Sequence, residues 1–224
     1  MEASRIWGEL ESELQADIEF VRSGILALAS SPTDVCKLEE GAQIASEYGL
    51  SSKLVSPDEI SRIVPELQNS WRLGLYTPDD GHAEPIKATR AFAEAAQRLG
   101  AEFMPNVIVR GIEVTNQRVT GVYVGDEVLR SGAVVCAAGI HGARLADSIG
   151  VTVPIRVSRS SVAETNPARN FTRTAIWSPN VAYRPTVRGT FYLGNGYAAQ
   201  GAEHDITLAS LRHLRQFLPS YLNN

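Results

Sequence analysis

The sequence contains little that would support a membrane-spanning, secreted or nucleic-acid-binding protein. Its longest apolar runs, residues 25–29 and 133–140, fall well short of the roughly 18 residues that a membrane-spanning helix needs. The acidic opening MEASRIWGELESEL has no basic region followed by an apolar one, so we expect a cytoplasmic protein without a secretory signal. The formal net charge of −4 leaves no excess of Lys and Arg for binding phosphates. We therefore expect neither a membrane nor nucleic acid as a partner.

Cysteine is scarce, and the motifs of several enzyme classes are missing. Of the two cysteines, Cys136 lies in the apolar run AVVCAAG, where a thiol acts as a small hydrophobic side chain, and Cys36 is far away in sequence, so we expect no structural disulfide. The sequence has no Gly-Lys-Ser/Thr, no Gly-x-Ser-x-Gly and no cysteine pair at metal-ligand spacing. The histidines are scattered and form no HExxH pattern: His82, His141, His204 and His213. We expect no metal site, and these motifs assign no catalytic residue.

What is present is the composition of a folded protein. The chain has 224 residues, of which 44% are hydrophobic and 21% charged, and this balance excludes collagen-like and disordered classes. At about 150 residues per domain, the length corresponds to between one and two domains. We find no fixed-period repeat and no biased linker, so the domains are expected to interleave within one body.

Residues 1–75 combine helices with short strands. Apolar residues at helical intervals predict a helix over residues 7–18, and Ser23-Gly24 between two apolar runs favours a hairpin of two strands. The segments SPTDVCKLEEGAQIASEYGL and SPDEISRIVPEL each begin with Ser-Pro, and they predict two further helices with Ser31 and Ser56 at their starts.

Residues 76–153 have a different pattern. EPIKATRAFAEAAQRLGA predicts an amphipathic helix whose buried face contains Ile86, Thr89, Phe92, Ala96 and Leu99. VIVRGIEV and RVTGVYV, on either side of a short polar connection, predict a hairpin. The continuous apolar run AVVCAA predicts a strand covered on both faces, followed by a turn and a helix over about residues 143–149.

Residues 154–224 predict an antiparallel sheet and a closing helix. The strand-like runs are VPIRVSRSSVAET, RTAIWS, VAYRPT and GTFYLG, and the helix is expected over residues 205–217. The fold class is therefore α+β.

Two glycine-containing segments are candidates for a nucleotide cofactor. Residues 194–199, GNGYAA, match a dinucleotide-binding pattern and suggest nicotinamide, but no acidic residue follows Asp205 to hold a ribose, so an ordinary glycine-rich loop is the stronger interpretation. In VVCAAGIHGARL, the small residues Ala137, Ala138 and Gly139 let another molecule approach the backbone closely, and the next helix directs free N–H groups towards the bend. Tight packing between strand and helix is the alternative for this second segment.

Taken together, three segments of the chain resemble the middle of a FAD-dependent oxidoreductase of the D-amino acid oxidase, glycine oxidase and sarcosine oxidase type. They are PDDGHAEPIKATRAFAEAAQRLGAEF, VIVRGIEVTNQRVTGVYV and EVLRSGAVVCAAGIHGARLADSIGVTVPIRVSR. Weaker likeness covers nearly all of the remaining chain. The resemblance implies a partial FAD-binding α/β domain over residues 76–153, joined to a substrate domain with an antiparallel sheet. The substrate domain is expected to take residues 1–75 and 154–224.

The resemblance also implies FAD contacts and a reaction. Val109 and the bend formed by Ala137, Ala138 and Gly139 stand where the family contacts FAD, and His141 stands where members usually carry an aromatic residue. The implied reaction oxidises the C–N bond of an amino acid or secondary amine to an imine, which water hydrolyses.

Substrates of this class usually carry a carboxylate, which a guanidinium binds through two parallel hydrogen bonds. Arg159, Tyr183 and Arg184 lie on predicted strands of the substrate half and are the candidates, with a solvated or structural role as the alternative for each. His82 precedes a helix, where a capping or turn role competes with a contact near the flavin.

Two parts of the family pattern are not found in the sequence. The family's first strand with its GxGxxG turn would precede Trp7, and its final glycine-rich turn and helix would follow Phe217. Because helix N-terminal N–H groups hold the pyrophosphate, we expect no tight FAD binding by this chain alone. Three explanations stay open: a truncated gene product, a misplaced start with a split reading frame, or a fragment that requires a complementary chain to complete the FAD site. The alternative is a non-catalytic remnant or subunit that binds no cofactor by itself.

Overall fold

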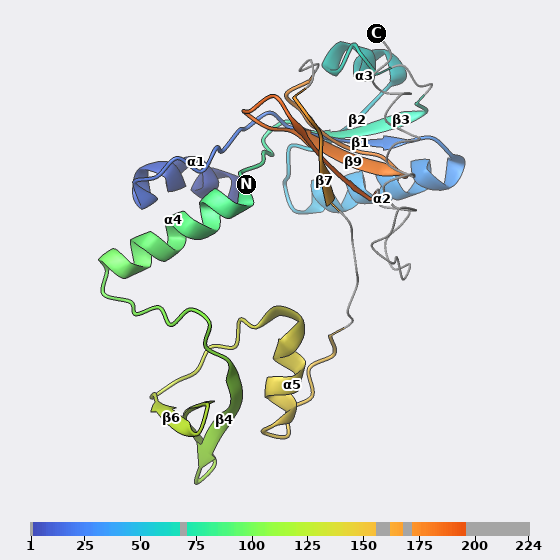
Figure 1. Cartoon of the computed structure of the whole chain (residues 1–224). Coiled ribbons are helices and arrows are strands. Elements are labelled where there is room, and N and C mark those ends of the chain that lie inside the picture. Colours follow the sequence, from blue (N-terminus) through green and yellow to red (C-terminus); the bar gives the residue numbers. More distant parts are fainter. Residues whose placement is uncertain (1, 68–70, 156–161, 168–171, 196–224) are drawn as a thin grey trace. The chain divides into compact units, whose positions relative to one another are not determined.

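The computed structural model describes residues 2–67, 71–155, 162–167 and 172–195 (Figure 1). The chain forms two compact units. The first unit contains Met1–Leu99 and Ser158–Asn224, and the second unit contains Gly100–Val157. The second unit is therefore an insertion in the sequence of the first.

The elements of the first unit come from both ends of the chain. They are α1 (Glu2–Leu14), β1 (Ile25–Ala29), α2 (Pro32–Glu47), β2 (Lys53–Val55), α3 (Pro57–Ile63), β3 (Leu73–Thr77), α4 (Pro85–Arg98), β7 (Val162–Glu164), β8 (Ala175–Trp177), β9 (Val181–Pro185) and β10 (Phe191–Asn195). The second unit contributes β4 (Val109–Thr115), β5 (Arg118–Val124), β6 (Glu127–Arg130), the 3-10 turn Gly139–His141 and α5 (Gly142–Asp147).

A seven-stranded sheet organises the first unit, with the order β2-β3-β1-β8-β9-β10-β7. Neighbouring strands are antiparallel except β1 and β8, which run parallel. The four late strands expected from the sequence are present and antiparallel to one another, as predicted. The closing helix expected over residues 205–217 lies outside the described residues.

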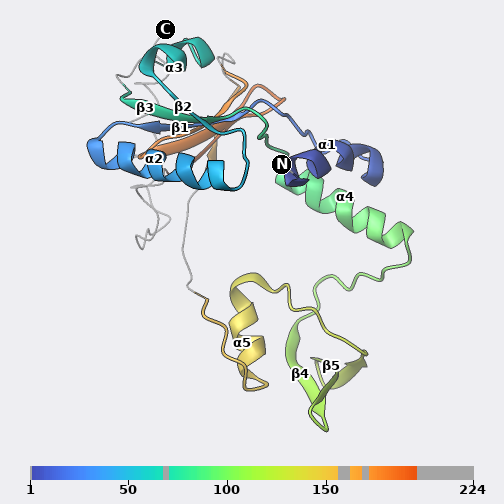
Figure 2. The ribbon, with the colours of Figure 1, turned by 180° about the vertical axis from the view of Figure 1, so that it is seen from behind.

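Two hydrophobic clusters stabilise the first unit. The larger cluster lies on one face of the sheet and joins strand residues such as Leu26 and Phe191 to Ile60 of α3. Figure 1 shows α3 on one face of the sheet and α2 on the other, and Figure 2 shows the same arrangement from behind. The smaller cluster joins α1 to α4 through Leu10, Leu14, Ile18, Ala88 and Ala91.

Two helices begin at the predicted serines. Ser31 accepts a hydrogen bond from the Asp34 amide at 3.2 Å, and the Asp34 carboxylate accepts one from the Ser31 amide at 3.0 Å. Ser56 and Glu59 make the same reciprocal pair. These capping boxes satisfy backbone N–H groups that have no partner within the helix.

The second unit is a three-stranded antiparallel sheet, β4-β5-β6, with α5 packed against β4. The predicted hairpin is confirmed, and its turn residues Asn116 and Gln117 have φ values of 51° and 61°. Over residues 100–155, the buried residues are all glycines: Gly111, Gly121 and Gly142. The described part of this unit thus buries no large apolar side chain.

The expected hairpin at Ser23-Gly24 is wrong. Only Val21 forms a bridge before the turn, and its partner is His82, while β1 after the turn pairs with β3 and β8. Strands distant in sequence outcompete the local pairing because they bury both edges of β1. The first helix also starts earlier than expected and ends at Leu14, although Ile18 is buried as a core residue.

The predicted buried face of α4 is also wrong. Ile86, Phe92 and Leu99 are 68%, 47% and 90% exposed, Thr89 is exposed and Ala96 is half-buried. The helix instead turns its alanine face towards α1, because small side chains allow the two helices to approach closely. The larger apolar side chains are left uncovered within the described residues.

The apolar run AVVCAA forms no strand in the structure. Val135 is 91% exposed, and Cys136, expected to act as a buried hydrophobic side chain, is exposed and free, as is Cys36. A strand needs a neighbour for its backbone N–H and C=O groups. The described residues provide none beside this run, although a helix follows it, as predicted. Within the same residues, no helix is long and apolar enough to cross a lipid bilayer.

Candidate functional site

The residues expected to contact FAD all lie in the second unit. Val109 begins β4 and is 37% exposed. Ala137 is exposed and Ala138 half-buried, and the 3-10 turn from Gly139 to His141 follows directly. The next helix, α5, has six residues, so the expected help from a helix dipole is small. The predicted FAD contacts therefore depend on the small residues of the bend, Ala137, Ala138 and Gly139.

The bend has room for a cofactor to approach. Gly139 has φ +54°, a conformation that side-chain-bearing residues rarely adopt, and a Cβ placed there would meet no described atom within 4 Å. The alanines before it project only methyl groups. The side chains of the described residues therefore leave this bend open, and Ala137, Ala138 and Gly139 are compatible with a nucleotide lying against their backbone.

A second candidate region is a pocket in the first unit, on the sheet near β8, β9 and β10. Its volume is about 460 Å³. The wall is largely apolar, with Trp177 and Ile86 48% and 68% exposed. The other lining residues with polar side-chain groups are His82, Glu84, Tyr183, Arg184 and Tyr192. A few polar groups in an apolar pocket are typical of a small-molecule site.

Arg184 is the central cation of this pocket. It stands on β9 opposite Tyr192 of β10, and its guanidinium carbon lies 4.5 Å from the centre of the Tyr192 ring. The guanidinium donates a hydrogen bond to Glu84 at 3.5 Å. A guanidinium has five N–H donors. One long hydrogen bond and one ring contact leave donors that can bind a carboxylate.

Glu84 supplies the negative charge beside Arg184. Its side chain is 3% exposed, and it also lies 3.8 Å from Arg188. Arg188 donates to Glu164 at 2.9 Å and to the Tyr192 hydroxyl at 3.2 Å. The two arginines and two glutamates form one connected charged cluster, of which Arg184 and Glu84 line the pocket.

His82 lies beside Arg184 on the same wall. Burial lowers the pKa of His82 below its ordinary value, and the positive charge of Arg184 lowers it further, while a backbone hydrogen bond with Arg173 partly opposes both. Its backbone is fixed by reciprocal hydrogen bonds to Val21 at 2.8 and 3.0 Å. The ring is therefore neutral near pH 7 and adds no charge to the pocket.

The structure does not bring the three predicted substrate residues together. Tyr183 contributes to the pocket wall, but its side chain is 5% exposed and belongs to the larger hydrophobic cluster, edge-on to Phe191. Successive residues of a strand point to opposite faces, which separates Tyr183 from Arg184. Arg159 lies outside the described residues, as does most of GNGYAA after Asn195.

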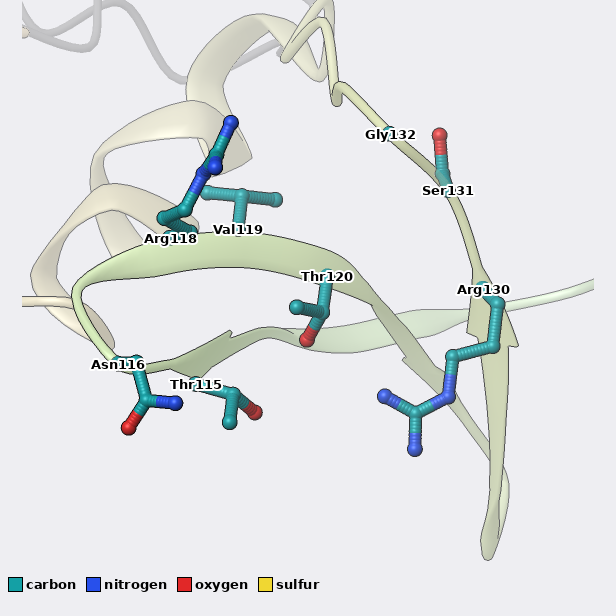
Figure 3. Close-up of a pocket in the computed structure, with 8 residues that line it drawn as sticks. All are labelled: Thr115, Asn116, Arg118, Val119, Thr120, Arg130, Ser131 and Gly132. Carbon is teal, nitrogen blue, oxygen red and sulfur yellow. The ribbon is translucent and has the colours of Figure 1, made fainter.

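The second unit has a broader hollow on its own sheet, with a volume of about 740 Å³. Figure 3 shows Arg118 and Arg130 extending to opposite sides of the β5 ribbon. Arg130 also donates to Glu113. The two cations do not converge on one point, so this hollow is a weaker candidate than the pocket containing Arg184.

The comparison with protein families identifies the family of this chain. The family model described as FAD dependent oxidoreductase (DAO) matches residues 1–224. The chain belongs to this family of FAD-dependent oxidoreductases. FAD is the family's cofactor, and the resemblance noted from the sequence is confirmed.

The curated relatives of this oxidoreductase act on amines or amino acids, as their names state. It is 30% identical over 150 residues to 4-methylaminobutanoate oxidase (formaldehyde-forming) of Paenarthrobacter nicotinovorans, a match covering 66% of this chain and 18% of the relative. It is 24% identical over 216 residues to sarcosine oxidase subunit beta of Arthrobacter sp, covering 90% of this chain and 53% of that subunit.

Solved structures agree on the fold. L-proline dehydrogenase from P. horikoshii superimposes with a TM-score of 0.83 at 24% identity, covering 97% of this chain and 60% of that one. Glycine oxidase from Geobacillus kaustophilus gives 0.82 at 17% identity, covering 96% and 58%. The predicted class, α+β with a partial FAD-binding domain and an antiparallel substrate-domain sheet, is confirmed. The chain spans about 60% or less of the length of these relatives.

Sequence reasoning missed three members of the charged cluster, Glu84, Arg188 and Glu164, and also the neighbouring Tyr192. Tyr192 could have been found by aligning the hairpin strands YRP and FYL, since cross-strand neighbours follow from the register. Glu84 is harder to find than Tyr192, because the sequence shows it only as an acidic residue just before a proline that starts a helix. Its burial comes from contacts across 100 positions of sequence, which no local pattern reveals.

Proposed function

We propose that this oxidoreductase uses FAD to oxidise the C–N bond of an amino acid or secondary amine to an imine, and that Arg184 binds the substrate's carboxylate. The supporting observation is a partly buried guanidinium with available donors in an apolar pocket. The family and the substrates named in its relatives support the reaction class.

The proposed FAD contacts are Val109, Ala137, Ala138, Gly139 and His141, for which the open bend is the support. When bound, FAD supplies the acceptor for a hydride equivalent from the carbon that carries the amine. His141 is exposed and takes the position where the family usually has an aromatic residue. The chain itself contributes binding and orientation of the substrate.

In this proposal, Arg184 forms paired hydrogen bonds with the carboxylate and so fixes one end of the substrate. Tyr192 stacks on the guanidinium and restricts its movement. Trp177 and Ile86 form part of the apolar wall, and a substrate lying against them would displace water from the pocket, which strengthens the ionic contact. The amine end then has a defined position relative to the carboxylate.

We further propose that a complementary polypeptide segment completes the FAD site. The support lies in the second unit, where the apolar run before Gly139 has no strand partner and large apolar side chains are uncovered among residues 100–155. Such a surface is stabilised by a partner that buries it. A non-catalytic remnant that binds no cofactor is the competing hypothesis.

The test is steady-state oxidation of N-methylglycine by the natural protein carrying its FAD. Arg184→Met should raise KM about tenfold or more with a smaller change in kcat, because the lost contact serves substrate binding. Arg90→Met changes an exposed arginine of α4 and is the matched control, expected to leave KM unchanged. An unchanged KM in Arg184→Met would remove Arg184 from substrate binding. If no carboxylate-bearing amine bleaches the flavin absorbance under anaerobic conditions, the result would favour the non-catalytic alternative.

A further inference from the structure

The charged cluster of the pocket contains a carboxylate in an unusual position. Glu84 is the residue immediately before α4, where its amide donates to the Ile18 carbonyl at 2.9 Å and its carbonyl accepts from the Ala88 amide at 2.9 Å. Its backbone is thus held by the segment after α1 and by the first turn of α4. Its side chain is 3% exposed, and a buried carboxylate stays charged only beside positive partners.

The positive partners of Glu84 come from the sheet. Arg184 Nη2 lies 3.5 Å from Glu84 Oε2, and Arg188 Nη2 lies 3.8 Å from the same oxygen. Arg184 belongs to β9, and Arg188 follows that strand in the turn to β10. The carboxylate therefore ties the start of α4 to the edge of the pocket where Arg184 stands.

Arg184 is restrained from two directions. Glu84 contacts one end of the guanidinium, and the Tyr192 ring lies against its face at 4.5 Å. Tyr192 is itself restrained, since its hydroxyl accepts a hydrogen bond from Arg188 at 3.2 Å. An arginine side chain otherwise has many rotamers, and ordering them before a ligand arrives improves binding.

We propose that Glu84 is a positioning residue that orients Arg184 for the substrate's carboxylate, with Arg188 and Tyr192 completing the support. This inference rests on the proposed role of Arg184. Glu84 acts through Arg184 and needs no contact with the substrate, consistent with its burial.

A second role for Glu84 would be to offset the charge of Arg184, and the two roles predict opposite results. Removing a charge that only offsets Arg184 would make the pocket more positive and tighten carboxylate binding. Removing a positioning group would release Arg184 and weaken the same binding. Carboxylate affinity therefore distinguishes them.

The experiment measures binding of N-methylglycine to the 224-residue chain by the fluorescence of Trp177, which lines the pocket. N-methylglycinamide, which has no carboxylate, is the matched probe. Trp177→Phe identifies the part of the signal that belongs to this tryptophan. Glu84→Gln keeps the shape of the side chain, Glu84→Ala removes it, and both are also made in the Arg184→Met background.

We expect Glu84→Ala to weaken N-methylglycine binding about tenfold and Glu84→Gln to weaken it less, since the amide oxygen still accepts a hydrogen bond. Binding of the amide probe should not change, which a general loss of structure would not spare. In Arg184→Met, the Glu84 changes should have no further effect on the carboxylate probe.

Unchanged or tighter N-methylglycine binding in Glu84→Gln and Glu84→Ala, with weaker binding in Arg184→Met, would overturn the positioning role and leave the proposed function intact. Equal binding in Arg184→Met and the unmodified chain, or no binding at all, would overturn the role of Arg184 as well. Equal weakening of both probes by the Glu84 changes would show a structural role instead.

Discussion

At the scale of single residues, the sequence identifies Arg184 more readily than its surroundings. Its charge and its place on a predicted strand suggest a carboxylate partner once the resemblance implies substrates that carry a carboxylate. The partners of Arg184 depend on register and on contacts between distant segments, so they emerge only from the fold. Tyr183 illustrates the limit, because a one-residue step along β9 moves a side chain from the pocket face into the core.

Some positions require glycine because a neighbouring backbone leaves no room for a side chain, and composition does not reveal which positions these are. A Cβ at Gly121 would lie 2.3 Å from the Leu129 carbonyl oxygen, which belongs to the paired strand β6. The backbone there cannot move without disturbing the sheet of the second unit. Gly121 therefore has a structural reason to lack a side chain.

Gly121→Ala is expected to destabilise the β5–β6 pairing by about 1–3 kcal/mol through overpacking. Faster amide hydrogen exchange in peptides from residues 118–130 would report this loss. Gly132→Ala is the matched control, because a Cβ there meets no described atom within 4 Å. Equal exchange in the two variants would contradict the steric argument.

At the scale of elements, helices are predicted well where their ends carry local chemistry. Both capping boxes can be inferred from Ser-Pro followed by an acidic residue. The faces of helices are harder to predict, because α4 buries its alanines against α1 and leaves larger side chains uncovered. The strand expected at AVVCAA is wrong for a related reason, since strand formation depends on a neighbour as well as on composition.

Ser31→Ala tests the cap of α2 and its pH dependence. Burial raises the pKa of the Asp34 carboxyl, but hydrogen bonds from Ser31 and Ser30 outweigh it, so the pKa lies below its ordinary value. A depressed pKa stabilises the folded state above the unfolded value of about 3.9, and the contribution is lost as pH falls through the lower folded value.

The substitution should therefore cost about 1 kcal/mol near pH 7, and the difference from the unmodified protein should narrow below about pH 4. Urea unfolding at several pH values measures both effects. Ser46→Ala, at an exposed position in the last turn of the same helix, should be neutral or slightly stabilising. A similar cost for both serines would refute the capping role.

At the scale of the whole molecule, the two units differ in how they are stabilised. The first unit has two hydrophobic clusters, whereas the described residues of the second unit bury only glycines. The alternation of helices and strands in the sequence predicts a mixed fold, and the resemblance to the family implies the division into two domains. The uneven burial could not be predicted, because the second unit also contains an apolar run, AVVCAA, and its sequence does not show that the run stays largely exposed.

We expect the second unit to unfold at a lower urea concentration than the first. The three tryptophans, Trp7, Trp71 and Trp177, all belong to the first unit, so their fluorescence reports that unit alone. Far-UV circular dichroism reports both units and should begin to change before the fluorescence does. Coincident transitions by the two methods would show instead that the units unfold together.

The parallel pairing of β1 with β8 has a consequence for protein synthesis. Residues 25–29 leave the ribosome long before residues 175–177, and the entire insertion is translated between them. At about 5–20 residues per second, the nascent β1 waits on the order of ten seconds with the backbone N–H and C=O groups of one edge unpaired. A chaperone that shields this edge during translation would protect the growing chain from intermolecular strand pairing.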